Sequence, residues 1–280
     1  MNDFFQSKFM YFCTMIKKML FVGFVLMSIV LSSCSNYSKL LKSTDNETKF
    51  EAAVDYFERK DYNRALELFD LLQAAYRGTA KGEEISYYTA YSYYHLKDYT
   101  VASYYFKRYV QSFQQYPRAE ECLFMNAYCY YLDSPKYSLD QSNTYTAISE
   151  LQLFIDTYPV SERVAEANEL IDKLRAKLEF KDFNICLMYY RMRDYMAAIT
   201  SFENLLKNYP DTERREEVLH YMALAYYEFA ENSIPEKKRE RYESAVEAYN
   251  NLLFLYPEST YLSELKDVDT KARQRLESYQ

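Results

Sequence analysis

Five times along this chain, a small residue is followed by apolar or aromatic residues four, seven and eleven positions later. The five copies are Ala65/Phe69/Leu72/Tyr76, Ala102/Phe106/Tyr109/Phe113, Ala147/Leu151/Phe154/Tyr158, Ala198/Phe202/Leu205/Tyr209 and Ala245/Tyr249/Leu252/Tyr256. Steps of four, three and four residues place all four side chains on one face of an α-helix. The pattern therefore predicts five amphipathic helices, in each of which the alanine lets a neighbouring helix approach closely.

A second pattern precedes each of these helices: a small residue with aromatic residues three and four positions later. The copies are Ala53…Tyr56-Phe57, Ala90…Tyr93-Tyr94, Ala127…Tyr130-Tyr131, Cys186…Tyr189-Tyr190 and, in a weaker form, Ala225…Glu228-Phe229. The two patterns start 12 residues apart in the first, second and fourth copies, and 20 apart in the third and fifth. We therefore expect helix–turn–helix units, with insertions within residues 133–143 and near residues 231–241.

These units resemble tetratricopeptide repeats, whose period is near 34 residues. Such a hairpin cannot bury its apolar face alone, so neighbouring hairpins stack around a continuous core. We predict an all-α fold: a tetratricopeptide-repeat superhelix of about five helix–turn–helix units plus a C-terminal capping helix over residues 261–278. Residues 160–209 contain no proline or glycine, so the first helix of the fourth unit should be long, from about residue 161 to 191.

The first 33 residues have the organisation of a secretory signal peptide. The 13-residue apolar run from Met19 to Leu31 follows two lysines; it is too short to span a bilayer and fits a signal sequence. The run ends in Leu31-Ser32-Ser33-Cys34, which resembles a bacterial lipobox. We expect cleavage before Cys34 and its acylation, for example by palmitate; an incidental cysteine is the alternative. Met15 is an alternative start of the chain.

The resulting organisation has four parts. Residues 1–33 are the signal peptide and residues 34–46 a lipid-anchored tether. Residues 47–159 contain repeats one to three. Residues 160–280 contain the long bridging helix, repeats four and five and the capping helix.

Composition excludes several functional classes. Three glycines are too few for a glycine-rich phosphate loop, and two distant histidines, His95 and His220, argue against a histidine zinc site or a catalytic triad. We therefore predict no enzyme, no cofactor and no metal. Removing residues 1–33 changes the formal net charge from −7 to −9, which disfavours nucleic acid as a partner. The cysteines after Cys34 are expected to be small buried residues.

The third and fourth units resemble those of one family. Residues 139–142 (Leu-Asp-Gln-Ser), followed by Ala147, Phe154 and Tyr158-Pro159, resemble the third repeat of the BamD family, lipoprotein subunits of the outer-membrane β-barrel assembly machinery. Residues 174–179 with Tyr189-Tyr190 resemble the long helix that follows. The resemblance covers residues 34 to about 260, although the first helices of the units are richer in tyrosine here.

The resemblance implies a non-enzymatic scaffold on the outer membrane of a Gram-negative bacterium, facing the periplasm and held by acyl chains on Cys34. It implies that the C-terminal repeats bind a BamA-like, barrel-forming subunit. It also implies that a groove in the N-terminal repeats receives the aromatic-rich C-terminal signal of unfolded outer-membrane β-barrel proteins.

Aromatic residues beyond the repeated patterns suggest where such a groove lies. The candidate peptide-binding surface consists of Tyr87, Tyr88, Tyr91, Tyr104 and Tyr105. Packing between repeats is the alternative role for each of them, but as a set they favour recognition, because aromatic rings are enriched at interfaces.

Two other functions fit this fold. One is a periplasmic tetratricopeptide-repeat adaptor in cell-envelope or division work. The other is a glycan-binding surface lipoprotein, which is less favoured because the chain has no tryptophan to stack on sugars.

Overall fold

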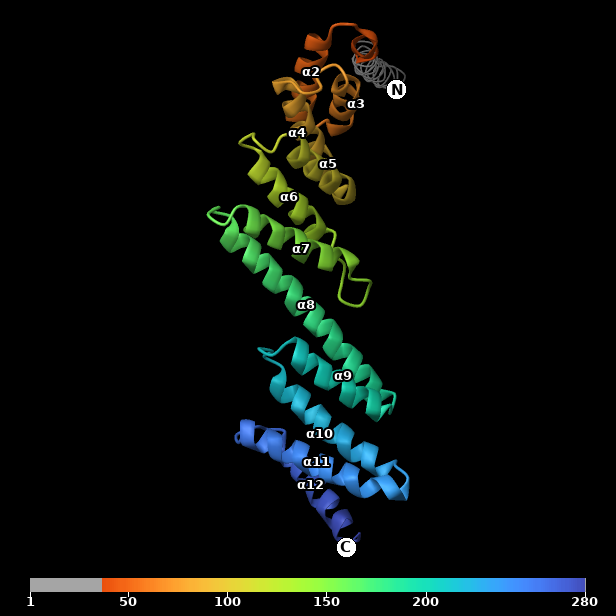
Figure 1. Ribbon diagram of the computed structural model, residues 1–280. Coiled ribbons are helices and arrows are strands. Elements are labelled where there is room, and N and C mark those ends of the chain that lie inside the picture. The colour runs from red at the N-terminus through yellow and green to blue at the C-terminus, as the bar shows by residue number, and fades with distance from the viewer. Residues whose placement is uncertain (1–36, 280) are drawn as a thin grey trace, which may run out of the picture. The chain divides into compact units, whose positions relative to one another are not determined.

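The computed structural model describes residues 37–279, and the secondary structure in this part of the chain is helical throughout (Figure 1). The helices are α2 (Asn46–Glu58), α3 (Tyr62–Gln73), α4 (Ala80–His95), α5 (Tyr99–Ser112), α6 (Ala119–Leu132), α7 (Ser142–Thr157), α8 (Val164–Arg191), α9 (Tyr195–Asn208), α10 (Arg215–Glu231), α11 (Pro235–Leu255) and α12 (Leu262–Glu277). In chain order they form five helix–turn–helix pairs followed by one more helix. The predicted all-α fold of tetratricopeptide type is confirmed.

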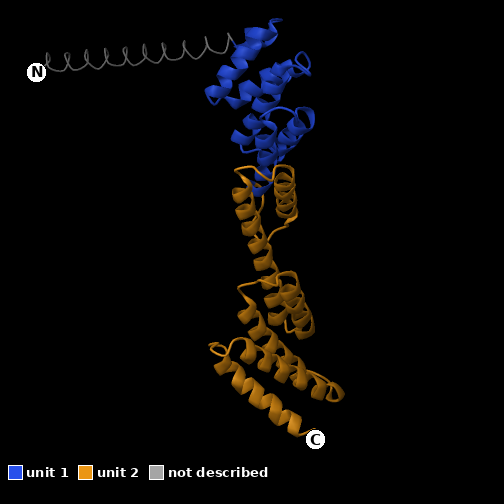
Figure 2. Ribbon diagram, turned by 60° about the vertical axis from the view of Figure 1, so that its left-hand side comes forward, with its two compact units in different colours: residues 1–132 blue, residues 133–280 orange. Residues whose placement is uncertain are grey.

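The chain divides into two compact units, residues 1–132 and 133–280 (Figure 2). Within the first, α2 packs on α3, α3 on α4, α4 on α5 and α5 on α6. Within the second, each helix from α7 to α12 likewise packs on the next in sequence. The division falls after Leu132, whereas the sequence analysis grouped residues 47–159; that grouping stays a prediction.

The repeated apolar pattern forms the core of each unit, as predicted. Ala65, Phe69 and Leu72 have no exposed surface, and Phe202 and Leu205 are at most 2% exposed. Burying one leucine or phenylalanine side chain stabilises a fold by roughly 1.5–3 kcal/mol. Because the stripe recurs on every second helix, this stabilisation is spread along the chain instead of being concentrated in one central core.

Three turns between paired helices share one backbone conformation. In each, a basic residue with positive φ precedes an aspartate that caps the next helix: Lys60-Asp61 (φ 64°), Lys97-Asp98 (φ 62°) and Arg193-Asp194 (φ 64°). The Asp98 carboxylate, for example, accepts a hydrogen bond from the Val101 N–H at 3.3 Å. Glycine is the usual residue at such a helix end, so each basic residue adopts this conformation at some cost in backbone strain.

The long helix is confirmed: α8 runs for 28 residues, close to the expected range of 161–191. The expected terminal helix is α12, which buries Leu265 and Ala272. The two insertions take different forms. In the third pair the insertion is a loop, in which the buried Gln141 side chain donates hydrogen bonds to the carbonyls of Lys136 and Leu139 at 2.8 and 3.0 Å. In the fifth pair the extra residues lengthen α11.

The start of the described chain is part of the first unit. Residues 37–42 are helical, and the Tyr37 ring lies edge-on to Tyr56, with ring centres 5.5 Å apart. Its hydroxyl donates a hydrogen bond to Glu67 at 2.6 Å. The later residues of the predicted tether therefore contact the first repeat. The predicted signal peptide, Met15 and Cys34 lie outside the described residues.

Candidate functional site

The first unit contains a hollow of about 570 Å³ between α3, α4 and α5. The residues that line it are Asp70, Gln73, Ala74, Arg77, Gly78, Gly82, Ser86, Tyr105, Arg108, Tyr109, Ser112 and Phe113. They bring together two guanidinium groups, the Asp70 carboxylate, the Gln73 amide, several hydroxyl groups and three aromatic rings. A ligand with a negative charge next to an apolar or aromatic group would match this lining.

Basic groups come from two sides of the hollow. Arg77 follows α3, and Arg108 lies on α5; both side chains are exposed. Within residues 37–279, neither forms an ion pair with a carboxylate, so both remain open to an anion. The hollow also lies at the N-terminus of α4, where the helix dipole favours negative charge.

Two glycines shape the entry to α4. Gly78 has φ +76°, a conformation that glycine adopts without strain. Gly82 lies in the first turn of α4, where an added Cβ would be 2.1 Å from the carbonyl oxygen of Tyr76. The Thr79 hydroxyl caps this turn by accepting a hydrogen bond from the Gly82 N–H at 3.2 Å. Only a residue without a side chain allows α4 to start this close to the end of α3.

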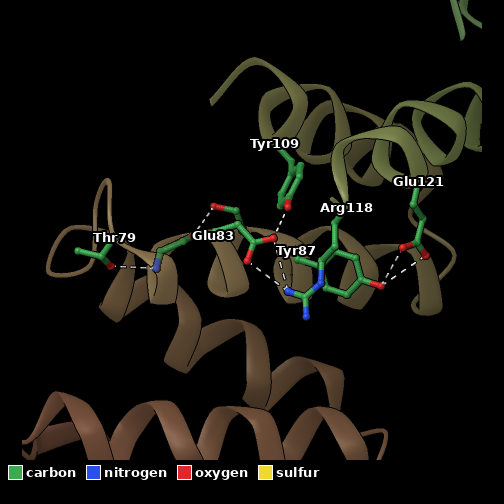
Figure 3. A network of polar contacts seen from close by, with 8 residues as sticks. Thr79, Glu83, Tyr87, Tyr109, Arg118 and Glu121 are labelled. Carbon is green, nitrogen blue, oxygen red and sulfur yellow. Dashed lines mark hydrogen bonds and ion pairs between the residues drawn. The ribbon is translucent and has the colours of Figure 1, made fainter. Parts of the chain in front are cut away.

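A network of charged and hydrogen-bonded side chains lies next to the hollow, which shares Tyr109 with it (Figure 3). Glu83, on α4, is only 5% exposed. It accepts a hydrogen bond from the Tyr109 hydroxyl of α5 and lies 3.3 Å from a guanidinium nitrogen of Arg118, which precedes α6. The same guanidinium lies over the ring of Tyr87, 4.5 Å from its centre. The network thus ties α4, α5 and the start of α6 together directly beside Gly82.

The tyrosines around this network remain protonated hydrogen-bond donors at neutral pH. Burial, together with the hydrogen bond to Glu83, raises the pKa of Tyr109 well above its usual value. Burial and the nearby Glu121 carboxylate raise the pKa of Tyr87 to about 12. These hydroxyls therefore act as neutral donors to the Glu83 and Glu121 carboxylates.

The five tyrosines predicted to form one binding surface lie in three different surroundings. Tyr105 lines the hollow and stacks on Tyr93, with ring centres 5.1 Å apart. Tyr104 is 60% exposed and lies edge-on to Tyr105 at 5.3 Å. Tyr88 is stacked on Phe69 at 5.8 Å and belongs to the packing between the first two pairs.

Tyr87 and Tyr91, also on α4, both donate hydrogen bonds to the Glu121 carboxylate of α6. Both rings are half-buried, and their centres are 4.7 Å apart. The structure therefore brings Tyr104 and Tyr105 together at or beside the hollow, whereas Tyr87, Tyr88 and Tyr91 contact neighbouring helices. The role of all five in peptide binding stays a prediction.

Arg77, Arg108 and the network of Glu83 were not predicted from the sequence. The sequence does contain one indication that the segment before α4 is unusual. Gly78 and Gly82, four residues apart, are the only glycines after residue 33. The arginines carry no such signal, because isolated basic residues are common on solvated helix faces.

Histidine and cysteine side chains in the described part serve packing. His95 stacks on Tyr62 at 4.8 Å, and His220 stacks on Tyr261 at 4.2 Å and lies 2.9 Å from Glu264. Cys122, Cys129 and Cys186 are buried thiols, as expected. No group of three or more His, Cys, Asp or Glu side chains among residues 37–279 is arranged to hold a metal ion. None of the described helices is both long and apolar enough to cross a bilayer.

The stacked helix–turn–helix pairs and the side chains packed between them define a class: a helical-repeat scaffold. Residues 42–242 match the family of YfiO, described as an outer membrane lipoprotein. The match spans most of the chain, so this protein belongs to the YfiO family of outer membrane lipoproteins, which is the BamD-like family expected from the sequence.

Individual relatives are similar over shorter stretches. The outer membrane protein assembly factor BamD of Buchnera aphidicola subsp. Acyrthosiphon pisum is 29% identical over 91 residues, 32% of this chain and 37% of that protein. The RNA polymerase-associated protein CTR9 of Saccharomyces cerevisiae is 31% identical over 98 residues, 34% of this chain and 9% of that protein. The chain thus matches little more than a third of the length of the BamD relative.

Solved structures with tetratricopeptide repeats are also similar. The P58(IPK) TPR domain is 14% identical in sequence, and its superposition on this chain has a TM-score of 0.40. The matched region covers 87% of this chain and 68% of the P58(IPK) chain. A TPR repeats protein of Bacteroides fragilis is 14% identical in sequence, with a TM-score of 0.37. The matched region covers 83% of this chain and all of the Bacteroides fragilis protein.

Proposed function

We propose that this protein is a lipid-anchored scaffold of outer-membrane β-barrel assembly. Its first unit receives the C-terminal signal of unfolded barrel proteins, and its second unit binds a BamA-like, barrel-forming subunit. Membership of a family of outer membrane lipoproteins and the helical-repeat fold support a non-catalytic scaffold. Acyl chains on Cys34 attach it to the outer membrane with the repeats in the periplasm.

The hollow of the first unit is the observation that carries this proposal. The C-terminus of a polypeptide places its carboxylate directly beside the last side chain. In the proposed C-terminal signal of barrel proteins, that last side chain is aromatic. Arg77 and Arg108 offer charge-assisted hydrogen bonds to the carboxylate. Tyr105 and Phe113 offer ring faces and edges to an aromatic side chain. Both halves of the ligand are therefore matched within one 570 Å³ space.

A peptide-binding experiment tests this assignment. A fluorescent ten-residue peptide that ends in phenylalanine with a free carboxylate is titrated with the protein, in parallel with the same peptide ending in an amide. The reference is the binding of the free-acid peptide to the wild-type protein. We expect the amide peptide to bind the wild-type protein at least tenfold more weakly. We expect the free-acid peptide to bind the Arg77→Ala/Arg108→Ala variant at least tenfold more weakly as well. Each loses a charge-assisted hydrogen bond, which contributes about 1.5–3 kcal/mol.

Arg59→Ala is the matched control, because Arg59 is an exposed arginine of the same unit that pairs with Asp55 at 2.8 Å instead of lining the hollow. It should leave the affinity unchanged. Equal binding of acid and amide would contradict the assignment of the hollow to a chain terminus.

Co-purification from solubilised membranes tests the wider role. We expect a barrel protein with periplasmic repeat domains to be recovered, and depletion of this protein to lower the levels of many outer-membrane barrels together. Recovery of peptidoglycan enzymes alone, with unchanged barrel levels, would instead support an adaptor in cell-envelope or division work.

A further inference from the structure

The hollow of the first unit contains one charge that a chain terminus does not match. Asp70, on α3, is the only carboxylate among the residues that line the hollow. It is exposed, and within residues 37–279 no lysine or arginine pairs with it. The C-terminal carboxylate of a ligand has the same sign of charge as Asp70. Asp70 is therefore suited to a different group of the same ligand, a positively charged one.

Asp70 and the nearest basic residue of the same segment lie at opposite ends of the hollow. Asp70, Gln73, Ala74 and Arg77 all line it, at positions i, i+3, i+4 and i+7, which is one face of a helix. Helical hydrogen bonding continues past the end of α3, because the N–H of Tyr76 donates to the carbonyl of Leu72. Seven residues of helix span roughly 10 Å. The acidic and basic ends of the hollow are therefore separated by about this distance.

An aromatic ring accompanies Asp70 at the acidic end. Burial raises the pKa of the Tyr105 hydroxyl, and the neighbouring Tyr93 hydroxyl raises it too. The Asp70 carboxylate raises this pKa further through its charge, so Asp70 lies close to Tyr105. The Tyr105 ring also has the exposed Tyr104 edge-on to it at 5.3 Å. A carboxylate beside aromatic rings favours a lysine or arginine side chain, because both groups attract a cation.

The opposite end of the hollow favours the chain terminus. Arg77 lies shortly before α4, whose dipole attracts an anion to the same end. The Tyr109 hydroxyl donates a hydrogen bond to Glu83 in the first turn of α4, so Tyr109 lies at this end as well. Phe113 follows four residues later, with its ring centre 5.4 Å from that of Tyr109. A carboxylate and a terminal aromatic side chain are therefore matched here, and a cation is matched at the Asp70 end.

We propose that Asp70 determines specificity in this hollow, by selecting C-terminal segments with a lysine or arginine two residues before the terminal aromatic residue. This proposal rests on the proposed function and adds to it which sequences the hollow prefers.

The position of the basic residue follows from the geometry of an extended chain. A segment that is to become a β-strand advances about 3.3 Å per residue, and alternate side chains lie on the same face. The residue two before the last therefore faces the hollow together with the terminal side chain, about 7 Å farther along the chain. A long lysine or arginine side chain covers the rest of the distance to Asp70. The residue directly before the last points to the opposite face and should not reach Asp70.

The test is a titration of the full chain, in detergent, with fluorescent peptides that end in phenylalanine with a free carboxylate. The peptides differ only in the residue two before the last, which is lysine or glutamine. At low salt we expect the lysine peptide to bind the wild-type protein about three- to fivefold more tightly, as for an exposed ion pair. This preference should disappear in Asp70→Asn and shrink at high salt. Lysine directly before the last residue should change Kd less than about twofold, because that side chain points away.

A charge reversal sharpens the test. Asp70→Lys should prefer a third peptide, with glutamate two residues before the last, over the lysine peptide. A merely structural role of Asp70 would not reverse the preference.

Glu58→Gln is the matched control, because it removes an exposed carboxylate of the same unit, at the end of α2, that does not line the hollow. It should keep the preference for the lysine peptide. Circular dichroism confirms that each variant is folded.

The outcomes separate this proposal from the proposed function. Equal binding of the lysine and glutamine peptides to the wild-type protein, or a preference that persists in Asp70→Asn, would overturn the role of Asp70. A gain in affinity for every peptide in Asp70→Asn, with the preference unchanged, would show that Asp70 only repels the terminal carboxylate, which also overturns it. In each case, tighter binding of the free acid than of the amide would leave the proposed function standing. No binding of any peptide would contradict the proposed function itself.

Discussion

The two units are built from the same helical pair but present different surfaces. The described part of the first, residues 37–132, has 12 basic and 13 acidic residues, a formal net charge of −1, against −8 for residues 133–280. Tyrosine makes up 17 of those 96 residues but only 15 of the 148 in the second unit. The first unit has an arginine-lined hollow, and the second has exposed methionines. One backbone design therefore carries two different surfaces.

One set of equivalent positions shows how this difference arises. Arg118 in the first unit corresponds to Arg214 in the second, and Glu83 corresponds to Glu179. Arg118 pairs with the buried Glu83. In the second unit Glu179 is half-buried and accepts a hydrogen bond from the Thr212 hydroxyl at 2.5 Å. The equivalent glutamate is therefore paired with an arginine in the first unit and accepts a hydrogen bond from a neutral hydroxyl in the second.

The largest expected effect comes from removing this arginine in each unit. Arg118→Met leaves the Glu83 carboxylate buried without a cation, and we expect a loss of about 2–3 kcal/mol, below the 3–5 kcal/mol of a fully buried pair because Arg118 is 38% exposed. Arg214→Met should cost less than about 1 kcal/mol, because its ion pair with Glu217 is partly solvated. Native-state hydrogen exchange of α4 and α10 measures both. Equal losses would mean that the two networks do not differ in energy.

A smaller effect is expected at the start of α4. Gly82→Ala places a methyl group against the Tyr76 carbonyl, and overpacking of this kind costs about 1–3 kcal/mol. Gly78→Ala has open space around it and should cost only about 1 kcal/mol for its positive φ. Urea denaturation compares the two. A Gly82→Ala variant as stable as Gly78→Ala would show that α4 can move away from α3 without loss.

The smallest effect concerns a feature that both units share. Lys97→Gly and Arg193→Gly each relieve a positive φ at a helix end, and we expect each to stabilise its unit by about 0.5 kcal/mol, partly offset by the greater freedom of glycine in the unfolded chain. Urea denaturation should show an increase in the free energy of unfolding for both variants. Opposite signs would show that the shared turn is not energetically equivalent in the two units.

Periodicity made the fold predictable from the sequence. The stripe of Ala65, Phe69 and Leu72 recurs with fixed spacing, and the absence of Pro and Gly from residues 160–209 correctly indicated the length of α8. The site was less predictable. The excess of tyrosine led to Tyr105, which lines the hollow, but also to Tyr88, which packs on Phe69. A tyrosine suits both positions, so residue type alone could not separate them.

The sequence by itself determined which faces of the helices are apolar, where the pairs turn and how the terminal helix ends the array, because these depend on residues within a few positions of one another. The tertiary structure decided which groups meet at the hollow. Arg77 and Arg108 are 31 residues apart, and they line one space because α4 can start close to the end of α3 only at Gly82. Distances between helices depend on such contacts, which no local pattern encodes.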